Sequence, residues 1–298
     1  MNLEGIFPPI TTPFRADESL ALDRLRDNIR KYNRTGVAGY VVTGSTGESV
    51  LLSRDETEQV WTAAREAAAT DMTLIAGTGA ESTSETIART NRAAALGYHY
   101  ALVKTPYYYK PVINDALLAE HFTRVADAAR IPVIVYSVPQ FTGVSVEPPL
   151  AARLAAHPNI AGIKESSGNI QRITEIISAA PQRFRTLVGS APTLYASLAV
   201  GAVGGILAAA CALPELCVEL YQAARAGDAP RAKELQHRLL APAIALTSRF
   251  GISGLKFAMD QLGYYGGPPR RPLLPVNESA RQEIDRVLSA VAAPAKTA

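Results

Sequence analysis

The residues best suited to chemistry are a lysine, a tyrosine and a hydroxyl-rich turn, each placed at the end of an apolar run. Lys164 ends the run Ile160–Lys164. Low-dielectric surroundings at such a strand end would disfavour the charged form of its amine. A neutral amine attacks a ketone and forms a Schiff base. A lysine that merely reaches from a strand end into solvent is the alternative, so the assignment depends on the other two groups.

The tyrosine and the turn supply what that amine lacks. Tyr136 ends another apolar run, and the segment Thr43–Glu48 follows a third. A phenol can relay protons, while the hydroxyls of Ser45 and Thr46 and the backbone around Gly47 can approach a carboxylate. Together these groups suit a 2-oxo acid that becomes an iminium, the electron sink for making or breaking a carbon–carbon bond.

Short apolar runs alternate with longer helical patterns along the chain, which is typical of parallel βα units. The predicted strands are Ile6–Ile10, Gly39–Val42, Thr73–Ala76, Tyr100–Val103, Val133–Tyr136, Ile160–Lys164, Arg185–Val188 and Gly204–Leu207. Eight units favour an α/β fold, a (β/α)8 TIM barrel, with catalytic groups at the C-terminal ends of its strands. An open doubly wound sheet is the alternative, although no dinucleotide-binding motif follows the first strand.

Several helix starts can be located from capping residues. Ser53 with Glu56, and Ser82 with Glu85, have the spacing of a capping box, in which each side chain accepts the other residue's backbone N–H. Asn114 can cap a further helix.

Helical patterns continue beyond the eighth unit. They cover Pro230–Phe250, Ser253–Gln261 and Glu278–Val291. We therefore expect residues 1–225 to form the catalytic barrel and residues 226–298 to form a C-terminal helical extension packed on it.

Composition excludes several classes of protein. The 298 residues are 48% hydrophobic and carry a net charge of +3 with both signs interspersed, so nucleic-acid binding has little support. No apolar run reaches the roughly 18 residues of a membrane span. The segment Met1–Gly5 does not resemble a secretory signal. Cys211 and Cys217 form no metal motif. A cytoplasmic protein with reduced thiols is the expectation.

The histidines argue against a zinc-dependent aldolase. They are scattered along the chain and do not stand at paired ligand spacing; they are His99, His121, His157 and His237. A catalytic zinc site needs several nitrogen or oxygen ligands in one pocket. We therefore predict no metal site.

At the lysine, the tyrosine, the hydroxyl-rich turn and two further segments, the chain resembles the dihydrodipicolinate synthase/N-acetylneuraminate lyase superfamily. The segments that carry the resemblance are Gly44–Glu48, Thr105–Tyr108, Tyr136–Pro139, Thr142–Gly143 and Gly162–Glu165, in order and with matching spacing from about residue 5 to residue 275. These are class I, pyruvate-handling aldolases on (β/α)8 barrels. The resemblance implies a carbon–carbon lyase, no metal or organic cofactor, and a homotetramer built from dimers.

The resemblance also implies roles for individual residues. Lys164 corresponds to the Schiff-base lysine and Tyr136 to the tyrosine that relays protons. Ser45 and Thr46 correspond to the pair that binds the pyruvate carboxylate, with Ser45 also in the proton relay. Tyr108 corresponds to a tyrosine lent to a neighbouring subunit's site; the alternative is an aromatic plug.

Other positions bear on the substrate. Gly47 in the turn and Ser166 near the lysine are candidate substrate-binding residues. Ile206 corresponds to an apolar residue that lines the pyruvate pocket; the alternative is an ordinary core isoleucine. Phe141 stands where the lysine-pathway synthases have an arginine that grips the aldehyde's carboxylate. Lys104 departs from an apolar position in the family. It is either an exposed lysine or a replacement for that missing charge.

Several segments look more like the 4-hydroxy-2-oxoglutarate aldolases, above all Gly263–Pro268. We therefore expect cleavage of 4-hydroxy-2-oxoglutarate to pyruvate and glyoxylate. Within the same chemistry, the alternatives are 4-hydroxy-tetrahydrodipicolinate synthase activity, a sialic-acid-type lyase and a dehydratase of a 2-oxo sugar acid. A phosphate- or flavin-binding barrel, suggested by Gly189–Ser190 and Gly204–Gly205, and a non-catalytic barrel are alternatives from other classes.

Overall fold

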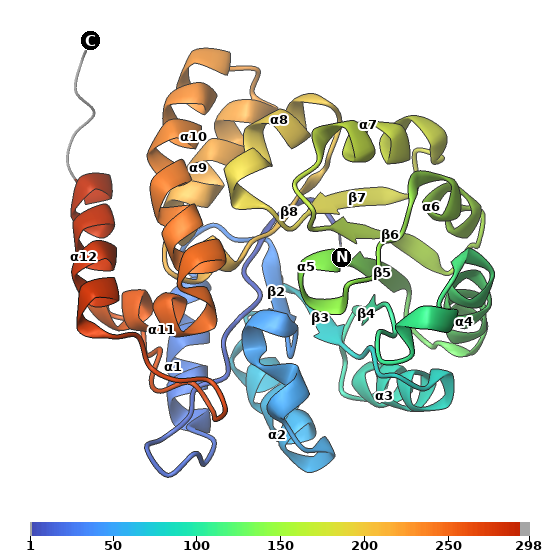
Figure 1. Cartoon of the computed structure of the whole chain (residues 1–298), viewed down its shortest axis with the longest axis horizontal. Helices are drawn as coiled ribbons and strands as arrows, with labels where there is room; N and C mark the ends of the chain where they lie inside the picture. The colour runs from blue at the N-terminus through green and yellow to red at the C-terminus, as the bar shows by residue number, and fades with distance from the viewer. Residues whose placement is uncertain (1, 293–298) are drawn as a thin grey trace.

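Eight parallel strands form the centre of the computed structural model, which describes residues 2–292 (Figure 1). The strands are β1 (Gly5–Phe7), β2 (Gly39–Val42), β3 (Thr73–Gly77), β4 (Tyr100–Lys104), β5 (Val133–Ser137), β6 (Ile160–Glu165), β7 (Arg185–Val188) and β8 (Gly204–Ile206). Each pairs with its neighbour in sequence from β2 to β8, and β8 pairs with β1. All eight predicted strands are therefore present.

The sheet closes between its first and second strands. The Ala38 N–H donates to Ile6 O at 2.9 Å, and the Val41 N–H donates to Pro8 O at 3.1 Å. The fold is thus the predicted (β/α)8 TIM barrel and not an open sheet. Strand β1 is shorter than predicted because Pro8 and Pro9 have no N–H to donate to a ladder.

Most of the helices surround the barrel on the outside (Figure 1). Those before residue 226 are α1 (Leu22–Tyr32), α2 (Arg54–Ala67), α3 (Thr83–Ala95), α4 (Asp115–Ala128), α5 (Pro139–Thr142), α6 (Pro148–Ala155), α7 (Ile170–Ala179), α8 (Leu194–Ala199) and α9 (Pro214–Arg225).

The capping predictions are confirmed with one difference. The box of Ser53 and Glu56 at the start of α2 is complete, and Asn114 caps α4. At α3, Ser82 accepts the N–H of Glu85, but the Glu85 carboxylate instead binds two arginines. Charge-assisted hydrogen bonds to arginine are stronger than a bond to the backbone N–H of Ser82, so the Glu85 carboxylate binds the arginines and leaves the capping box incomplete.

The barrel interior is filled by side chains, so any site must lie at its mouth. One buried cluster contains inward-facing residues from most of the strands; among its members are Phe7, Val41, Ile75, Leu102, Ile134, Tyr136, Leu187 and Ile206. A layer of this kind is a packed core and not a channel.

The C-terminal region comprises α10 (Ala229–Ala243), a π-helical turn at 244–249, α11 (Gly251–Gln261) and α12 (Glu278–Ala292). The predicted single helix over 230–250 is therefore interrupted, because Pro242 lacks the N–H of a regular helical turn. Leu246, Leu255 and Ile284 pack against Cys211 in one buried cluster, which attaches this region to the barrel. The boundary at residue 226 stays a prediction, and residues 293–298 lie outside the described part.

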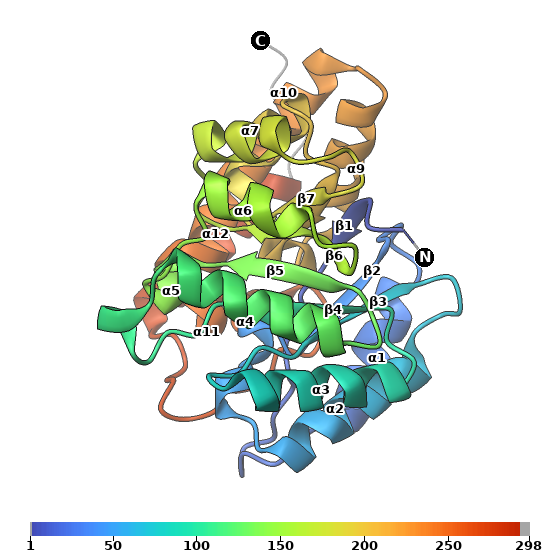
Figure 2. The same cartoon turned by 90° about the vertical axis from the view of Figure 1, so that its right-hand side faces the viewer.

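The connection that follows α11 reaches the C-terminal ends of the strands. In Figure 2, β5 points to the left, and both α5 and the segment after α11 lie on that side. We call residues 264–270 the strap. It contacts α1, where the Asn28 side chain donates to Tyr265 O and accepts from the Tyr265 N–H, both at 2.8 Å. The C-terminal region therefore extends to the mouth of the barrel.

Candidate active site

Three of the predicted site residues share one level of the barrel. Lys104 on β4 is in register with Tyr136 on β5, which is in register with Lys164 on β6. Paired residues of a parallel sheet point to the same face, and Tyr136 belongs to the interior cluster. All three side chains therefore face the inside at the C-terminal ends of their strands.

A bulge in β6 sets this level. Val133 pairs with Ile160, but Ile134 pairs with Gly162, so Ala161 is an extra residue. If Ala161 were instead paired in a regular ladder, Ile163 would stand beside Tyr136 and Lys164 would face outward. Gly162 suits this close packing because a Cβ there would lie 2.0 Å from a carbonyl oxygen of β7.

The Lys164 side chain is buried but has no acidic partner. The residue is 5% exposed, and its Nζ lies 4.1 Å from the centre of the Tyr136 ring. In the described range 2–292, Lys164 forms no ion pair, whereas Lys104 and Lys256 each have a carboxylate within 4.0 Å. An amine in this setting is free to react with a ligand.

An unused hydroxyl lies next to that amine. A Cβ placed at Gly189 would be 1.9 Å from Ser166 Oγ and 3.2 Å from Lys164 Cε, so both side chains pack into the space that glycine leaves. Ser166 Oγ is buried and lacks a hydrogen-bond partner among the described residues. A buried polar atom left without a partner in the protein has hydrogen-bonding capacity for a ligand or an ordered water.

The turn after β2 completes the site. Residues Ser45–Gly47 form one 3-10 turn, and Ser45 Oγ lies 3.5 Å from the Tyr136 hydroxyl, the outer limit of a hydrogen bond. Thr43 and Glu48, which flank the turn, have φ values of +57° and +55°. Such left-handed non-glycine residues persist where surrounding contacts hold them. One such contact is the Trp61 indole N–H, which donates to Thr43 Oγ1 at 2.7 Å.

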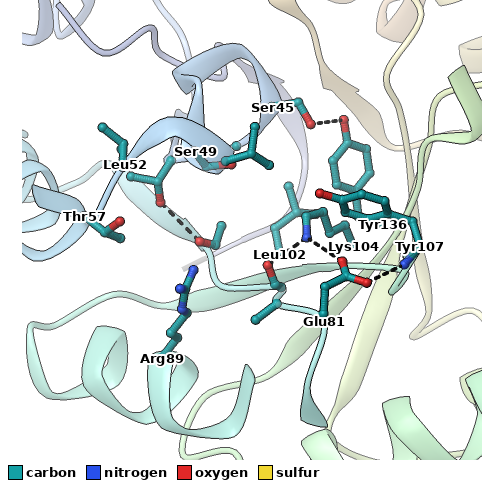
Figure 3. A pocket seen from close by; sticks show the side chains of 16 residues that line it. Ser45, Ser49, Leu52, Thr57, Glu81, Arg89, Leu102, Lys104, Tyr107 and Tyr136 are labelled. Carbon is teal, nitrogen blue, oxygen red and sulfur yellow. Dashed lines mark hydrogen bonds and ion pairs between the residues drawn. The ribbon is translucent and has the colours of Figure 1, made fainter. Parts of the chain in front are cut away.

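A cavity of about 220 Å³ opens between the turn and strands β3 to β5 (Figure 3). Figure 3 shows Ser45 and Tyr136 pointing toward one another, with Lys104 on the same side of the cavity and Arg89 opposite. Lys164 does not line this cavity, but Tyr136 does, and the Tyr136 ring also contacts the Lys164 amine. Tyr136 therefore lies between the amine and the cavity. The cavity has two cationic groups on its wall and one acidic group, Glu81.

Lys104 is not the exposed lysine that one alternative expected. Its side chain is 15% exposed, and its Nζ donates to Gly79 O at 3.1 Å and lies 3.9 Å from Glu81 Oε1. Burial lowers the pKa of Lys104, and the nearby Glu81 carboxylate partly opposes that effect. Lys104 therefore contributes a weakly neutralised positive charge to the cavity.

The remaining predicted residues fall into two groups. Thr46 and Gly47 lie in the turn, and Ile206 is buried in the interior cluster that includes Tyr136. Phe141 and Tyr108 are instead 67% and 73% exposed. Neither is part of the cavity lining in this single chain.

Sequence reasoning assigned no function to a second buried lysine, Lys256 on α11, or to Arg270 in the strap. Lys256 is fully buried, with its Nζ 2.5 Å from Glu48 Oε1. Burial lowers the pKa of Lys256, and the Glu48 carboxylate opposes the shift. A lysine on the apolar face of a predicted helix was the signal that could have revealed this pair.

Metal and membrane features were also sought in residues 2–292. There, no group of three or more His, Cys, Asp or Glu side chains is placed to hold a metal ion. Cys211 and Cys217 are both buried and free. No helix in that range is both long enough and apolar enough to cross a bilayer.

Comparisons with known proteins agree with this geometry. The model of the dihydrodipicolinate synthetase family matches residues 2–291. The chain is 38% identical over 286 residues to the 4-hydroxy-tetrahydrodipicolinate synthase of Methanothrix thermoacetophila, covering 96% of each chain. It is 40% identical over 288 residues to the enzyme of that name from Methanoculleus marisnigri, covering 96% of this chain and 98% of the relative.

Solved structures give the same result. The dihydrodipicolinate synthase from Acinetobacter baumannii, solved in complex with pyruvate, superposes with a TM-score of 0.94 at 31% identity, covering 98% of this chain and 99% of the other. The likeness extends over the barrel and the C-terminal helices alike.

Proposed function

The chain belongs to the dihydrodipicolinate synthetase family and is a class I, pyruvate-dependent aldolase, and we propose that its Schiff base forms on Lys164. The observation that carries this assignment is a buried amine without an acidic partner, 4.1 Å from the Tyr136 ring. The family resemblance and the geometry both support the choice of Lys164.

The proposed reaction begins when Lys164 Nζ attacks the C2 ketone of pyruvate. Water leaves from the resulting carbinolamine, and an iminium forms that draws electrons from C3. Tyr136, with Ser45 behind it, moves the protons between these groups. Loss of a C3 proton gives an enamine, which adds to an aldehyde carbon and forms the new carbon–carbon bond. Hydrolysis of the product imine frees the amine, and cleavage follows the same steps in reverse.

The other predicted residues would bind the substrate. The hydroxyl and backbone N–H of Thr46 suit the pyruvate carboxylate, because the turn lies beside Tyr136, with Ser45 Oγ 3.5 Å from its hydroxyl. The Gly47 N–H already donates to Gly44 O at 3.0 Å, so Gly47 would act by shaping the turn. Ser166 Oγ has no other partner among the described residues and can donate to the same carboxylate. The buried Ile206 side chain would pack against the methyl end of the ligand.

For the second substrate, we favour condensation of pyruvate with a carboxylate-bearing aldehyde, the alternative in our sequence analysis. Two relatives at 38% and 40% identity carry the name 4-hydroxy-tetrahydrodipicolinate synthase. Lys104 and Arg89, on the wall of the cavity beside Tyr136, would hold the aldehyde's carboxylate. The reaction class expected from the sequence is retained, but its preferred substrate changes.

Cleavage of 4-hydroxy-2-oxoglutarate remains the second candidate because of Phe141. That side chain is 67% exposed and offers no charge where the synthases are expected to use arginine. Losing a bidentate contact of that kind costs on the order of 2 kcal/mol or more. The distal carboxylate of this dicarboxylate substrate would instead bind through Lys104.

Assembly, cofactor use and location are also proposals. The exposed side chains of Tyr108 and Tyr109, stacked edge to face at 5.1 Å, suit burial against another copy of the chain, as a homotetramer would provide. No cofactor is proposed because the iminium that Lys164 would form with the substrate is itself the electron sink. A cytoplasmic location stays a prediction.

The test is borohydride reduction in the presence of pyruvate, followed by mass mapping of peptides. We expect one reduced pyruvyl adduct on the peptide with Lys164, unchanged in a Lys104→Met control. Tyr136→Phe should still form the adduct, but more slowly. An adduct on Lys104, or none at all, would refute the site. Assays of pyruvate consumption with the synthase aldehyde and of pyruvate release from 4-hydroxy-2-oxoglutarate then decide between the two candidates.

A further inference from the structure

A second buried lysine lies beside the turn that is proposed to bind pyruvate. The Lys256 side chain is 1% exposed and the Glu48 side chain 0%, and Lys256 Nζ lies 2.5 Å from Glu48 Oε1. The same amine donates to Pro268 O at 3.0 Å and lies 4.6 Å from the centre of the Phe14 ring. The ammonium is thus held from the strap as well as by the carboxylate.

The second oxygen of Glu48 is held by the strap itself. The backbone N–H of Arg270 donates to Glu48 Oε2 at 2.8 Å. The Arg270 guanidinium binds both oxygens of Glu56, at 2.8 and 2.7 Å, and donates to Leu51 O at 2.9 Å. The strap is therefore fastened to the loop at Glu48, at Leu51 and at the first turn of α2.

Glu48 is well placed to control the turn because it ends it. Its backbone N–H donates to Ser45 O at 3.0 Å, and its φ of +55° is unfavourable unless contacts impose it. Gly47 O, the preceding carbonyl, accepts from Thr12 Oγ1 at 2.6 Å. Neither Glu48 nor Lys256 lines the cavity, so the pair does not contact a ligand there.

We propose that the Glu48–Lys256 ion pair is a positioning device that holds the Ser45–Gly47 turn in the geometry needed for pyruvate capture. This inference rests on the proposed function. Ser45 Oγ is already 3.5 Å from the Tyr136 hydroxyl, so even a small shift of the turn would break that contact. The C-terminal region thereby acts on the site through Glu48, without touching the substrate.

The experiment compares Glu48→Gln, Lys256→Met and the charge-neutral double variant with the wild-type chain. Glu48→Gln keeps the side chain's shape and its acceptor for Arg270. The control is Arg249→Gln, which removes an ion pair to Glu283 in the same C-terminal region, 2.6 Å long and more exposed. For each, the pyruvate concentration that gives half-maximal borohydride trapping is measured well below the melting temperature.

We expect this concentration to rise about 10- to 100-fold in all three pair variants and to stay unchanged in the control. Circular dichroism identifies the variants that are folded. If Lys256→Met is not folded, the trapping results of Glu48→Gln and of the double variant decide whether the inference holds. Folded pair variants that trap pyruvate at the wild-type concentration would overturn the inference, because the pair would then be purely structural. Failure of the wild-type chain to trap pyruvate would instead overturn the proposed function, and this inference with it.

Discussion

Lys164 and Lys256 are both nearly inaccessible, with exposures of 5% and 0%, yet their surroundings are opposite. Lys256 has a carboxylate 2.5 Å away and a carbonyl acceptor, so its charge is balanced inside the protein. Lys164 has an aromatic ring and a nearby unpartnered hydroxyl. Burying an ionisable amine without an acidic partner is costly, and proteins retain such a group where function requires it.

This difference separates a lysine that maintains the fold from one that is available for reaction. Burial alone does not distinguish the two, because both amines are shielded from water. The distinguishing feature is whether the neighbouring acceptors are already used. Replacing each lysine in turn therefore tests whether Lys164 and Lys256 differ in this way.

The largest effect is expected for Lys164→Met. Because the proposed covalent intermediate forms on this amine, turnover should fall by about 10⁴-fold or more. The variant should be no easier to unfold than the wild type, because the change removes a buried amine that has no compensating carboxylate. Steady-state assays and urea unfolding measure the two quantities. A strongly destabilised Lys164→Met variant would contradict the comparison.

The opposite pattern of stability is expected for Lys256→Met. The substitution leaves the fully buried Glu48 carboxylate without its counter-charge, which costs roughly 3–5 kcal/mol of unfolding free energy. Adding Glu48→Gln should recover a large part of that loss. Urea unfolding of the single and double variants measures the coupling. If the single variant were as stable as the wild type, the pair would not be the structural partner described here.

Lys104 tests an intermediate case, because its side chain is partly buried, at 15% exposed, and its nearest carboxylate lies 3.9 Å away. Lys104→Met should weaken binding of a carboxylate-bearing second substrate about tenfold, while half-saturation by pyruvate changes little. Measuring KM for both substrates separates the two effects. An equal change in both would assign Lys104 to general packing instead.

The smallest effect concerns a buried base outside the site. Burial lowers the pKa of His121 to about 4, against a usual value of 6.5, and its Nε2 has no partner among the described residues. The unfolded chain therefore binds more protons than the folded one between these values, so stability is lost as pH falls below 6.5. Between pH 7 and pH 5.5 the loss from this group is about 1 kcal/mol.

His121→Asn should remove that part of the pH dependence. Unfolding free energies of the variant and the wild type at pH 7 and pH 5.5 give the difference. An unchanged pH slope would mean that His121 is protonated as easily in the folded protein as in the unfolded chain.

The sequence was sufficient for the features that depend on local pattern. The run ending at Lys164, the run ending at Tyr136 and the turn at Ser45 were found because alternating βα units place strand ends at one face. Local chemistry also explains the errors. Strand β1 stops early at two prolines, and the helix predicted through residue 250 is interrupted after Pro242.

Features that depend on register or on distant segments could not be predicted. The burial of Lys104 follows from the pairing level of β4 with β5. The partner of Glu48 comes from α11, far along the chain, and no spacing rule links the two. Phe141 and Tyr108 are exposed in a single chain. Any role for them depends on contacts with another molecule, which the sequence of one chain does not specify.

The fastening of the strap to Glu48 also has a consequence for the order of biosynthesis. A nascent polypeptide that has emerged from the ribosome only through β8 already contains Lys164, Tyr136 and the Ser45 turn, but not Lys256. Its Glu48 has no counter-charge until α11 has been translated. If the pair positions the turn, a truncated translation product carries the reactive amine but cannot yet bind pyruvate well. The site becomes able to bind pyruvate only after the C-terminal helices have been translated.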